Sequence, residues 1–340
     1  MIHHLLLNDF RTITKSPLFV WGLALCFFCG TVQSQGQIAW DNTALDGAGI
    51  SGLDYQTKSF FEGDHRFPAA LDVIPYENHK GEKEHLILSR DGDLWSVPTK
   101  GIQAKAQEHL IMNIRSHFKD SGEGVPNYKS VQLLSGILDR DWPKRPHLYL
   151  AVHGQSGTEG RCMIVRYTVN IESGMSLKEK PDILFSWKTI NHNGCDLQWG
   201  PKDGLLYFSA GDGSVQRDPQ KVGQQVHVVR GSILRIDVHS QPESGRAYVI
   251  PPDNPFVGMK NVLSEIWAYG LRNPWRICFH PTTKELWVAD NGDEQWEMLH
   301  CVKRGSNAGW SSFEGHQPFN LDLPLGGPTR THTPPRLAQD

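Results

Sequence analysis

A histidine and an aspartate twenty positions apart are the first side chains in this sequence that could perform acid–base chemistry. His192 lies in the glycine-containing turn of "NHNGCDLQWGP" (191–201), and Asp212 follows the next apolar segment in "SAGDG". If two antiparallel strands lie between them, Asp212 returns to the same end and can hydrogen-bond one imidazole nitrogen. The other nitrogen is then a candidate general base. The alternative is a surface histidine beside an aspartate that closes a hairpin.

Two neighbouring polar residues form a second candidate group in "AYGLRNPWR" (268–276), where Arg272 precedes Asn273. A guanidinium offers two parallel donors to a carboxylate, so this pair suits an anionic ligand. The alternative is a turn at the start of a strand, in which Arg272 pairs with a neighbouring acidic residue.

An acidic turn follows in "ADNGDEQWE" (289–297), where Gly292 would leave backbone carbonyl oxygens exposed. Such oxygens, together with oxygens of a ligand, can hold Ca²⁺. The spacing does not match a twelve-residue EF-hand loop, and a plain turn is the alternative.

A recurrent strand–turn–strand pattern must position these groups. It occurs in three segments: 85–98, 196–213 and 276–293. A looser copy spans 138–154. Pro201 and Pro281 stand 80 positions apart, which is two units of about 40 residues, the length of a propeller blade. The pattern predicts an all-β fold, a β-propeller. A β-sandwich is the competitor but does not explain the repeat. Turns that recur once per blade would bring the candidate groups to one face.

The composition agrees with an all-β chain and narrows its partners. The 340 residues include 33 Gly, 21 Pro and 11 Trp, which suits many tight turns. The formal net charge is only −3 and the basic residues are scattered, so nucleic acid is not an expected partner.

The N-terminus carries the pattern of an export signal. The apolar stretch 16–30 follows Arg11 and Lys15 and precedes the small residues Val32 and Ser34. We predict a signal peptide over 1–34, an irregular segment over 35–66, and a periplasmic or secreted protein with no stable membrane insertion after cleavage. An uncleaved membrane anchor is the alternative.

Four cysteines follow the predicted signal peptide, and none belongs to a C-x-x-C pair: Cys162, Cys195, Cys278 and Cys301. In an exported protein this even number allows two disulfides in three possible connectivities. Free buried thiols are the alternative.

Five ordered segments together carry a family resemblance: "NHNGCDLQWGPKDGLLYFSAGDGS", "RGSILRIDV", "YVIPPDNPF", "EIWAYGLRNPWRICFHP" and "GSNAGWSSFEG". They resemble the glucose/sorbosone dehydrogenase family, the soluble aldose sugar dehydrogenases that use pyrroloquinoline quinone (PQQ). The resemblance is dense over 191–315 and weaker over 71–170. It implies a six-bladed β-propeller with PQQ over its axis and a Ca²⁺ ion on the quinone.

The resemblance also implies roles for the candidate residues. His192 would take the proton from the anomeric hydroxyl of an aldose sugar as hydride passes to PQQ, and Asp212 would orient that histidine. The pair Arg272 and Asn273 would contact the cofactor. Since the sequence contains no C-x-x-C-H haem motif, electrons would leave to an external electron acceptor.

The metal-binding turn and one glutamine complete the implied site. Gly292 and Asp293 would offer backbone oxygens to Ca²⁺. Gln132, in "SVQLLSGILDRDWP", is the candidate for a glutamine that touches PQQ in the family, although the glycine that normally follows is displaced.

Two further departures from the family pattern affect the prediction. Cys195 stands where the family usually has a second glycine, and the sequence stops at 331–340, before the family's last blade. We therefore expect a propeller over 67–340 that is incomplete at its C-terminus.

The sequence thus predicts an exported PQQ- and Ca²⁺-dependent dehydrogenase that oxidises an aldose to its lactone. The departures favour an alternative, a non-catalytic β-propeller that binds a protein or a glycan. A calcium-dependent lactone hydrolase is a third hypothesis, which requires converging carboxylates that the sequence does not obviously supply.

Overall fold

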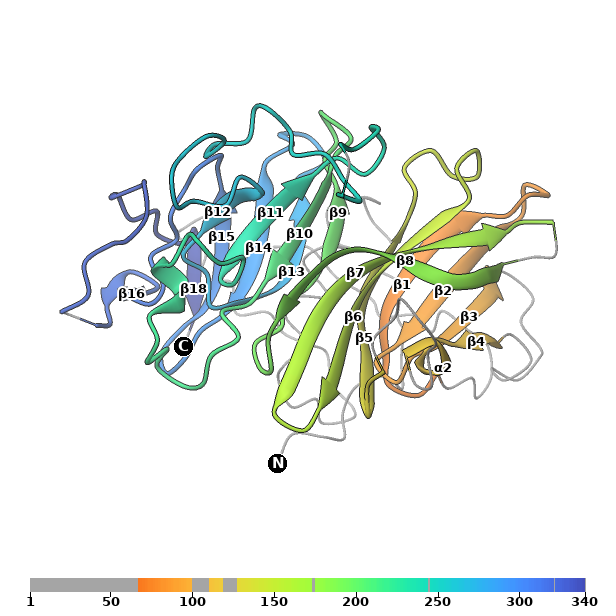
Figure 1. Ribbon diagram of the computed structural model, residues 1–340, viewed down its shortest axis with the longest axis horizontal. Coiled ribbons are helices and arrows are strands. Elements are labelled where there is room, and N and C mark those ends of the chain that lie inside the picture. Colours follow the sequence, from red (N-terminus) through yellow and green to blue (C-terminus); the bar gives the residue numbers. More distant parts are fainter. Residues whose placement is uncertain are drawn as a thin grey trace, which may run out of the picture.

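The described part of the chain is almost entirely β-structure (Figure 1). The computed structural model describes residues 67–99, 110–118, 127–172, 175–243, 245–320 and 322–339. The predicted signal peptide and the segment 35–66 lie outside these residues. The described helices are two short turns, α2 (Arg115–Phe118) and η3 (Val222–Gln224).

The first two sheets are four-stranded and antiparallel, and each strand pairs with the next along the sequence. The first sheet contains β1 (Ala70–Glu77), β2 (Lys83–Ser89), β3 (Asp93–Pro98) and β4 (Leu110–Asn113). The second contains β5 (Ser130–Leu138), β6 (His147–Ser156), β7 (Glu159–Asn170) and β8 (Ser176–Lys188).

Two further four-stranded antiparallel sheets and a small hairpin follow. The third sheet contains β9 (Leu197–Trp199), β10 (Leu206–Ala210), β11 (Ser232–Ile236) and β12 (Ile266–Tyr269). The fourth contains β13 (Asn273–Phe279), β14 (Leu286–Asn291), β15 (Glu297–Val302) and β18 (Leu337–Gln339). The hairpin pairs β16 (Phe313–Glu314) with β17 (Gln317–Pro318).

The predicted strand–turn–strand segments are the antiparallel pairs β2–β3, β9–β10 and β13–β14. In the first, Gly92 has a φ of +88°, a left-handed conformation that glycine adopts without steric cost. At each of the three places a short polar turn joins two apolar strands. The prediction of a hairpin there is confirmed.

The four sheets stand side by side as the blades of a β-propeller, from the orange sheet to the blue one in Figure 1. The first strand of each sheet lies innermost: β1 contacts β5, β5 contacts β9, and β9 contacts β13. The all-β propeller is confirmed. The described residues form four blades, and the six blades that the resemblance implies are not all found among them.

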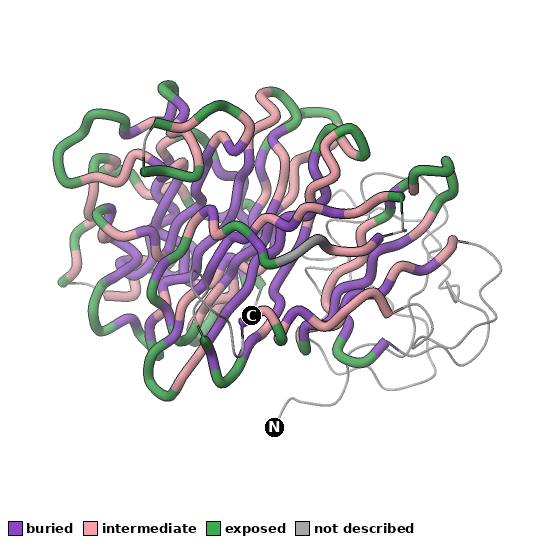
Figure 2. Tube along the Cα trace, turned by 45° about the vertical axis from the view of Figure 1, so that its right-hand side comes forward, coloured by how far each residue is buried: buried purple, intermediate pink, exposed green. Residues whose placement is uncertain are grey.

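Apolar layers between neighbouring blades hold the sheets together. Tyr207 and Phe208 show how this works, because adjacent residues of a strand face opposite sides. Phe208 packs into the layer with the second sheet, and Tyr207 packs into the layer with the fourth. Figure 2 shows that the buried residues, drawn in purple, concentrate in the interior of the molecule. Burial on both faces explains why β10 carries the consecutive apolar residues Leu206, Tyr207 and Phe208.

A polar cluster lies where the four innermost strands meet. The guanidinium of Arg276, on β13, donates to the carbonyl oxygens of Leu71 on β1 (3.0 Å) and Leu134 on β5 (3.4 Å). It lies 3.9 Å from the carboxylate of Asp196, which precedes β9. Asp196 also accepts hydrogen bonds from the Ser135 hydroxyl (2.6 Å) and the backbone N–H of Ile277 (2.8 Å). We call Arg276, Asp196 and Ser135 the axial cluster.

The four cysteines are free thiols in the structure, so two formed disulfides are not found. Cys278 and Cys301 cannot pair, because each lies opposite Trp287, on either side of β14. Two strand spacings separate their Cα atoms by about 9.5 Å, and a disulfide requires less than about 7 Å.

Candidate active site

The hairpin β9–β10 brings His192 and Asp212 together. The imidazole Nδ1–H of His192 donates to Asp212 Oδ1 at 2.8 Å. His192 precedes β9 and Asp212 follows β10, and the register of these strands pairs Leu197 with Phe208. The antiparallel return of the strand therefore places both side chains at the same end of the blade.

The carboxylate of Asp212 is fixed from several sides. It accepts hydrogen bonds from the backbone N–H and the hydroxyl of Ser214, both at 2.9 Å, and from the indole N–H of Trp310 at 2.8 Å. The Asp212 side chain is fully buried, whereas that of His192 is 20% exposed. Within the described part of the chain, His192 Nε2 has no hydrogen-bond partner, so the dyad presents one ring nitrogen outward.

The Arg272–Asn273 segment lies directly beside this dyad. The backbone N–H of Asp212 donates to the Arg272 carbonyl at 2.7 Å, and the backbone N–H of Gly194 donates to Asn273 Oδ1 at 3.1 Å. The start of β13 and the two ends of the preceding hairpin thus form one continuous rim. His192 and Arg272 lie at the same end of the molecule, although 80 residues separate them.

The guanidinium of Arg272 is held by an acidic side chain of the next turn. Its Nη2 donates to Asp293 Oδ1 at 2.6 Å, and its plane lies over the Trp310 ring, 5.6 Å from the centroid. Arg272 Nε is buried without a hydrogen-bond partner among the described residues. The pairing of Arg272 with a neighbouring acid, one of the two alternatives above, is therefore present.

Asp290 supports the same segment from below. Its two carboxylate oxygens accept the backbone N–H groups of Arg272 (3.1 Å) and Asn273 (2.7 Å). Burial raises the pKa of Asp290 to about 7, although both hydrogen bonds act in the opposite direction. Asp290 therefore lies within the wall that carries the rim.

The turn after β14 is organised by Glu314. Its Oε1 accepts four successive backbone N–H groups, those of residues 293–296, at 2.6–3.3 Å. A side chain on Gly292 would meet the Trp296 carbonyl oxygen, so the backbone at 292 admits only glycine. No group of three or more His, Cys, Asp or Glu within the described ranges is arranged to hold a metal ion.

Gln132 lies near the start of β5, one of the innermost strands. It sits on β5 opposite His153, whose Nε2 is 3.2 Å from the Thr189 carbonyl oxygen in the segment that leads to His192. Gln132 is therefore linked to the loop that carries His192 through its cross-strand neighbour His153. Among the residues described, no hydrogen bond joins its side chain to His192 or Arg272.

Sequence reasoning missed Trp310 and Glu314 as parts of the site. Trp310 contacts both the dyad and the arginine, and Glu314 shapes the turn at Gly292. Both belong to "GSNAGWSSFEG", one of the segments that carried the family resemblance. That resemblance was the signal from which these two residues could have been found.

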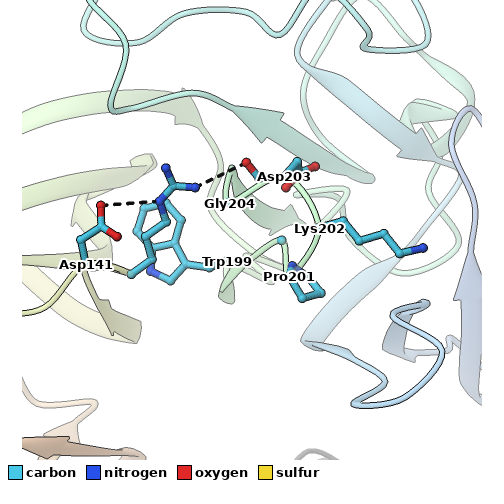
Figure 3. Close-up of a pocket in the computed structure, with 8 residues that line it drawn as sticks. Asp141, Trp199, Pro201, Lys202, Asp203 and Gly204 are labelled. Atoms are coloured by element: carbon cyan, nitrogen blue, oxygen red, sulfur yellow. Dashed lines mark hydrogen bonds and ion pairs between the residues drawn. The ribbon is translucent and has the colours of Figure 1, made fainter.

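A pocket at the opposite end of the third blade does not belong to this site (Figure 3). It surrounds the β9–β10 turn, where Arg140 reaches Asp141 and the carbonyl oxygen of Asp203. The hairpin runs from the rim to this turn and back, so the pocket and His192 lie at opposite ends. The pocket contains no histidine and offers no comparable base.

The fold and the rim define a class: β-propellers that carry a His–Asp dyad beside an arginine at one end of the blades. A family model described as Glucose / Sorbosone dehydrogenase matches residues 74–332. The chain belongs to this family.

Two curated relatives show the range within that family. The human Hedgehog-interacting protein is 37% identical over 210 residues, which cover 58% of this chain and 27% of that protein. The aldose sugar dehydrogenase YliI of Escherichia coli is 28% identical over 257 residues, which cover 73% of this chain and 59% of the enzyme. The chain thus spans between about a quarter and three fifths of the length of these relatives.

A solved structure agrees with the fold. The PQQ-bound form of aldose sugar dehydrogenase from Streptomyces coelicolor superposes with a TM-score of 0.57 at 24% identity, over 80% of this chain and 68% of that chain. Separately, none of the helices within the described residues is long and apolar enough to cross a membrane.

Proposed function

We propose that this protein is an exported dehydrogenase that oxidises the anomeric hydroxyl of an aldose to the lactone, with PQQ and Ca²⁺. The observation that carries the proposal is the dyad: an imidazole that is 20% exposed and whose Nδ1 is fixed 2.8 Å from a buried carboxylate. Membership of the family and the likeness to YliI support the same chemistry.

The dyad suits proton abstraction from a sugar hydroxyl. Because Asp212 accepts the Nδ1 proton, His192 Nε2 keeps its lone pair and can take the hydroxyl proton. Three donors from Ser214 and Trp310 hold the carboxylate in place, so the imidazole is already oriented before the sugar binds. Asp212 acts as a positioning residue and His192 as the base.

The rim beside the dyad fits an anionic cofactor. PQQ carries three carboxylates and supplies the acceptor for the hydride that leaves the sugar. Arg272 would hold a cofactor carboxylate, since its buried Nε is a donor that lacks a partner in the described residues. Asn273 would add hydrogen bonds, and Gln132 is a further proposed contact.

The turn after β14 is the proposed position of Ca²⁺. The backbone oxygens of Gly292 and Asp293 would bind it together with oxygens of the cofactor. The third hypothesis, a lactone hydrolase, requires converging carboxylates around the ion, and the described residues contain no such group.

A specific contact favours a second function, a non-catalytic propeller that binds a protein or a glycan. Asp293 accepts a hydrogen bond from Nη2 of Arg272 and its side chain is fully buried, so an internal anion already neutralises the guanidinium that would hold a cofactor carboxylate. The Hedgehog-interacting protein, a relative of comparable identity, is named for an interaction with another protein.

Titration of the purified full chain with PQQ and Ca²⁺ separates the two functions. A dehydrogenase binds PQQ stoichiometrically, then reduces an artificial dye when an aldose is added, and loses this activity with a chelator. Absence of PQQ binding at concentrations that saturate YliI would exclude the dehydrogenase and leave the binding module.

The cellular location and the chain organisation are parts of the same proposal. A signal peptide over 1–34 would direct the protein to the periplasm or the exterior, and residues 67–340 would form the propeller. Electrons would pass to an external acceptor. Sequencing the N-terminus of the mature protein tests the cleavage site, which we expect near Ser34.

A further inference from the structure

Two cysteine side chains meet in the layer between the second and third blades. Cys162 lies on β7, opposite Trp187 of β8 and His153 of β6. Cys195 lies in the connection from β8 to β9, three residues after His192. Both side chains are completely buried in the same apolar cluster, and the two thiols are within hydrogen-bonding distance of each other.

We propose that Cys162 and Cys195 form a disulfide that ties β7 to the loop carrying His192. Each thiol loses a proton, and the two sulfur atoms join. The two electrons reduce the disulfide of an oxidising partner, a protein disulfide or glutathione disulfide, which leaves as two thiols. No cofactor or substrate is required.

The local geometry is compatible with this bond. The two thiols interact within the same buried cluster, and bond formation requires the sulfur atoms to approach to roughly 2 Å. The same segments are joined by the backbone hydrogen bond from the Thr189 N–H to the Gly160 carbonyl at 3.0 Å. The main chain on either side of the two cysteines is therefore already held together.

The backbone of Cys195 gives a second, independent reason. Its φ of +78° is in the left-handed region, where a side chain is disfavoured and glycine is the usual residue. A cysteine is therefore kept here at a conformational cost, which burial of its thiol beside Cys162 can offset.

The chain contains its own control pair. Cys278 and Cys301 are separated by β14 and cannot reach each other. Neither lies in the apolar cluster that holds Cys162 and Cys195. Of the three connectivities open to four cysteines, the only pairing that the structure places in contact is Cys162 with Cys195.

Differential alkylation of the full chain tests the pairing. For this test the protein is expressed with export to an oxidising compartment. It is then unfolded in guanidinium without reductant and treated with light iodoacetamide. It is then reduced, treated with the heavy reagent and digested for mass spectrometry. We expect the heavy label on Cys162 and Cys195 and the light label on Cys278 and Cys301. The light label on all four, or the heavy label on Cys278, would overturn the proposal.

A thermal measurement checks the same bond without digestion. Reduction should lower the Tm of the wild-type protein by about 5–10 °C, since the closed loop of the unfolded chain is released. Cys162→Ser should show no such shift, whereas Cys278→Ser should retain it. An equal response to reduction in the wild type and in Cys162→Ser would show that no bond joins these residues.

Discussion

The rim and the axial cluster are built from the same innermost strands but differ in how completely their polar groups are satisfied. In the axial cluster, Arg276 and Asp196 are both more than nine-tenths buried and bind partners on all sides. At the rim, Asp212 is equally enclosed, but His192 is partly exposed and its Nε2 is without a partner in the described residues.

This difference separates structural from chemical roles. A buried ion pair whose hydrogen bonds are all made stabilises the arrangement of the blades and has no capacity left for a ligand. A histidine with one nitrogen fixed and the other facing outward retains that capacity. We therefore expect substitutions in the axial cluster to change stability, and substitutions at the rim to change activity.

The largest effect is expected for His192→Gln. Glutamine can still donate a hydrogen bond to Asp212, but it cannot accept a proton, so kcat should fall by about 10²–10⁴-fold. Aldose-dependent dye reduction by the PQQ-loaded protein measures this, and urea unfolding should be unchanged. The exposed His227→Gln is the matched control. A kcat within about threefold of wild type would remove His192 from the mechanism.

Asp196→Ala should give the opposite profile. It removes the carboxylate nearest to Arg276 and leaves the buried backbone N–H of Ile277 without its acceptor, so the free energy of unfolding should fall by about 3–5 kcal/mol in a urea titration. Asp182→Ala is the control, because Asp182 is 64% exposed and its ion pair with Arg166 should contribute only about 0–1 kcal/mol. Similar losses in both variants would mean that the axial cluster has no special role.

The pH dependence of stability should report Asp290, in the wall beneath the rim. Burial raises its pKa to about 7 in the folded protein, so its contribution to stability is complete below about pH 4 and is lost as the pH rises to 7. Asp290→Asn cannot titrate. Between pH 4 and pH 7 the variant should gain about 2–4 kcal/mol relative to wild type. Parallel pH profiles for the two proteins would contradict this.

The smallest expected effect concerns Asp293, the internal partner of Arg272. Asp293→Asn removes a carboxylate that competes with those of PQQ, so PQQ should bind about tenfold more tightly, or about 1.4 kcal/mol. Titration of tryptophan fluorescence measures the Kd. Glu294→Gln, which changes an acidic side chain paired with Arg217, should leave the Kd unchanged. Weaker binding in Asp293→Asn would mean that Asp293 positions Arg272 for the cofactor.

The sequence predicted those parts of the site that depend on local folding. The apolar strands on either side of the 200–205 turn predicted a hairpin, and a hairpin brings His192 and Asp212 to one end whatever packs around them. The same reasoning could not place Gln132, because its relation to the site depends on how the second blade packs against the third.

The sequence by itself determined the all-β class, the hairpins and the pairing of His192 with Asp212, since strand periodicity and chain reversal act over about twenty residues. Only the tertiary structure decided that Asp293 holds Arg272, that Arg276 joins the innermost strands, and that Cys162 meets Cys195. These contacts depend on how the blades pack together and on how turns and side chains pack against one another. No local pattern in the sequence specifies those positions.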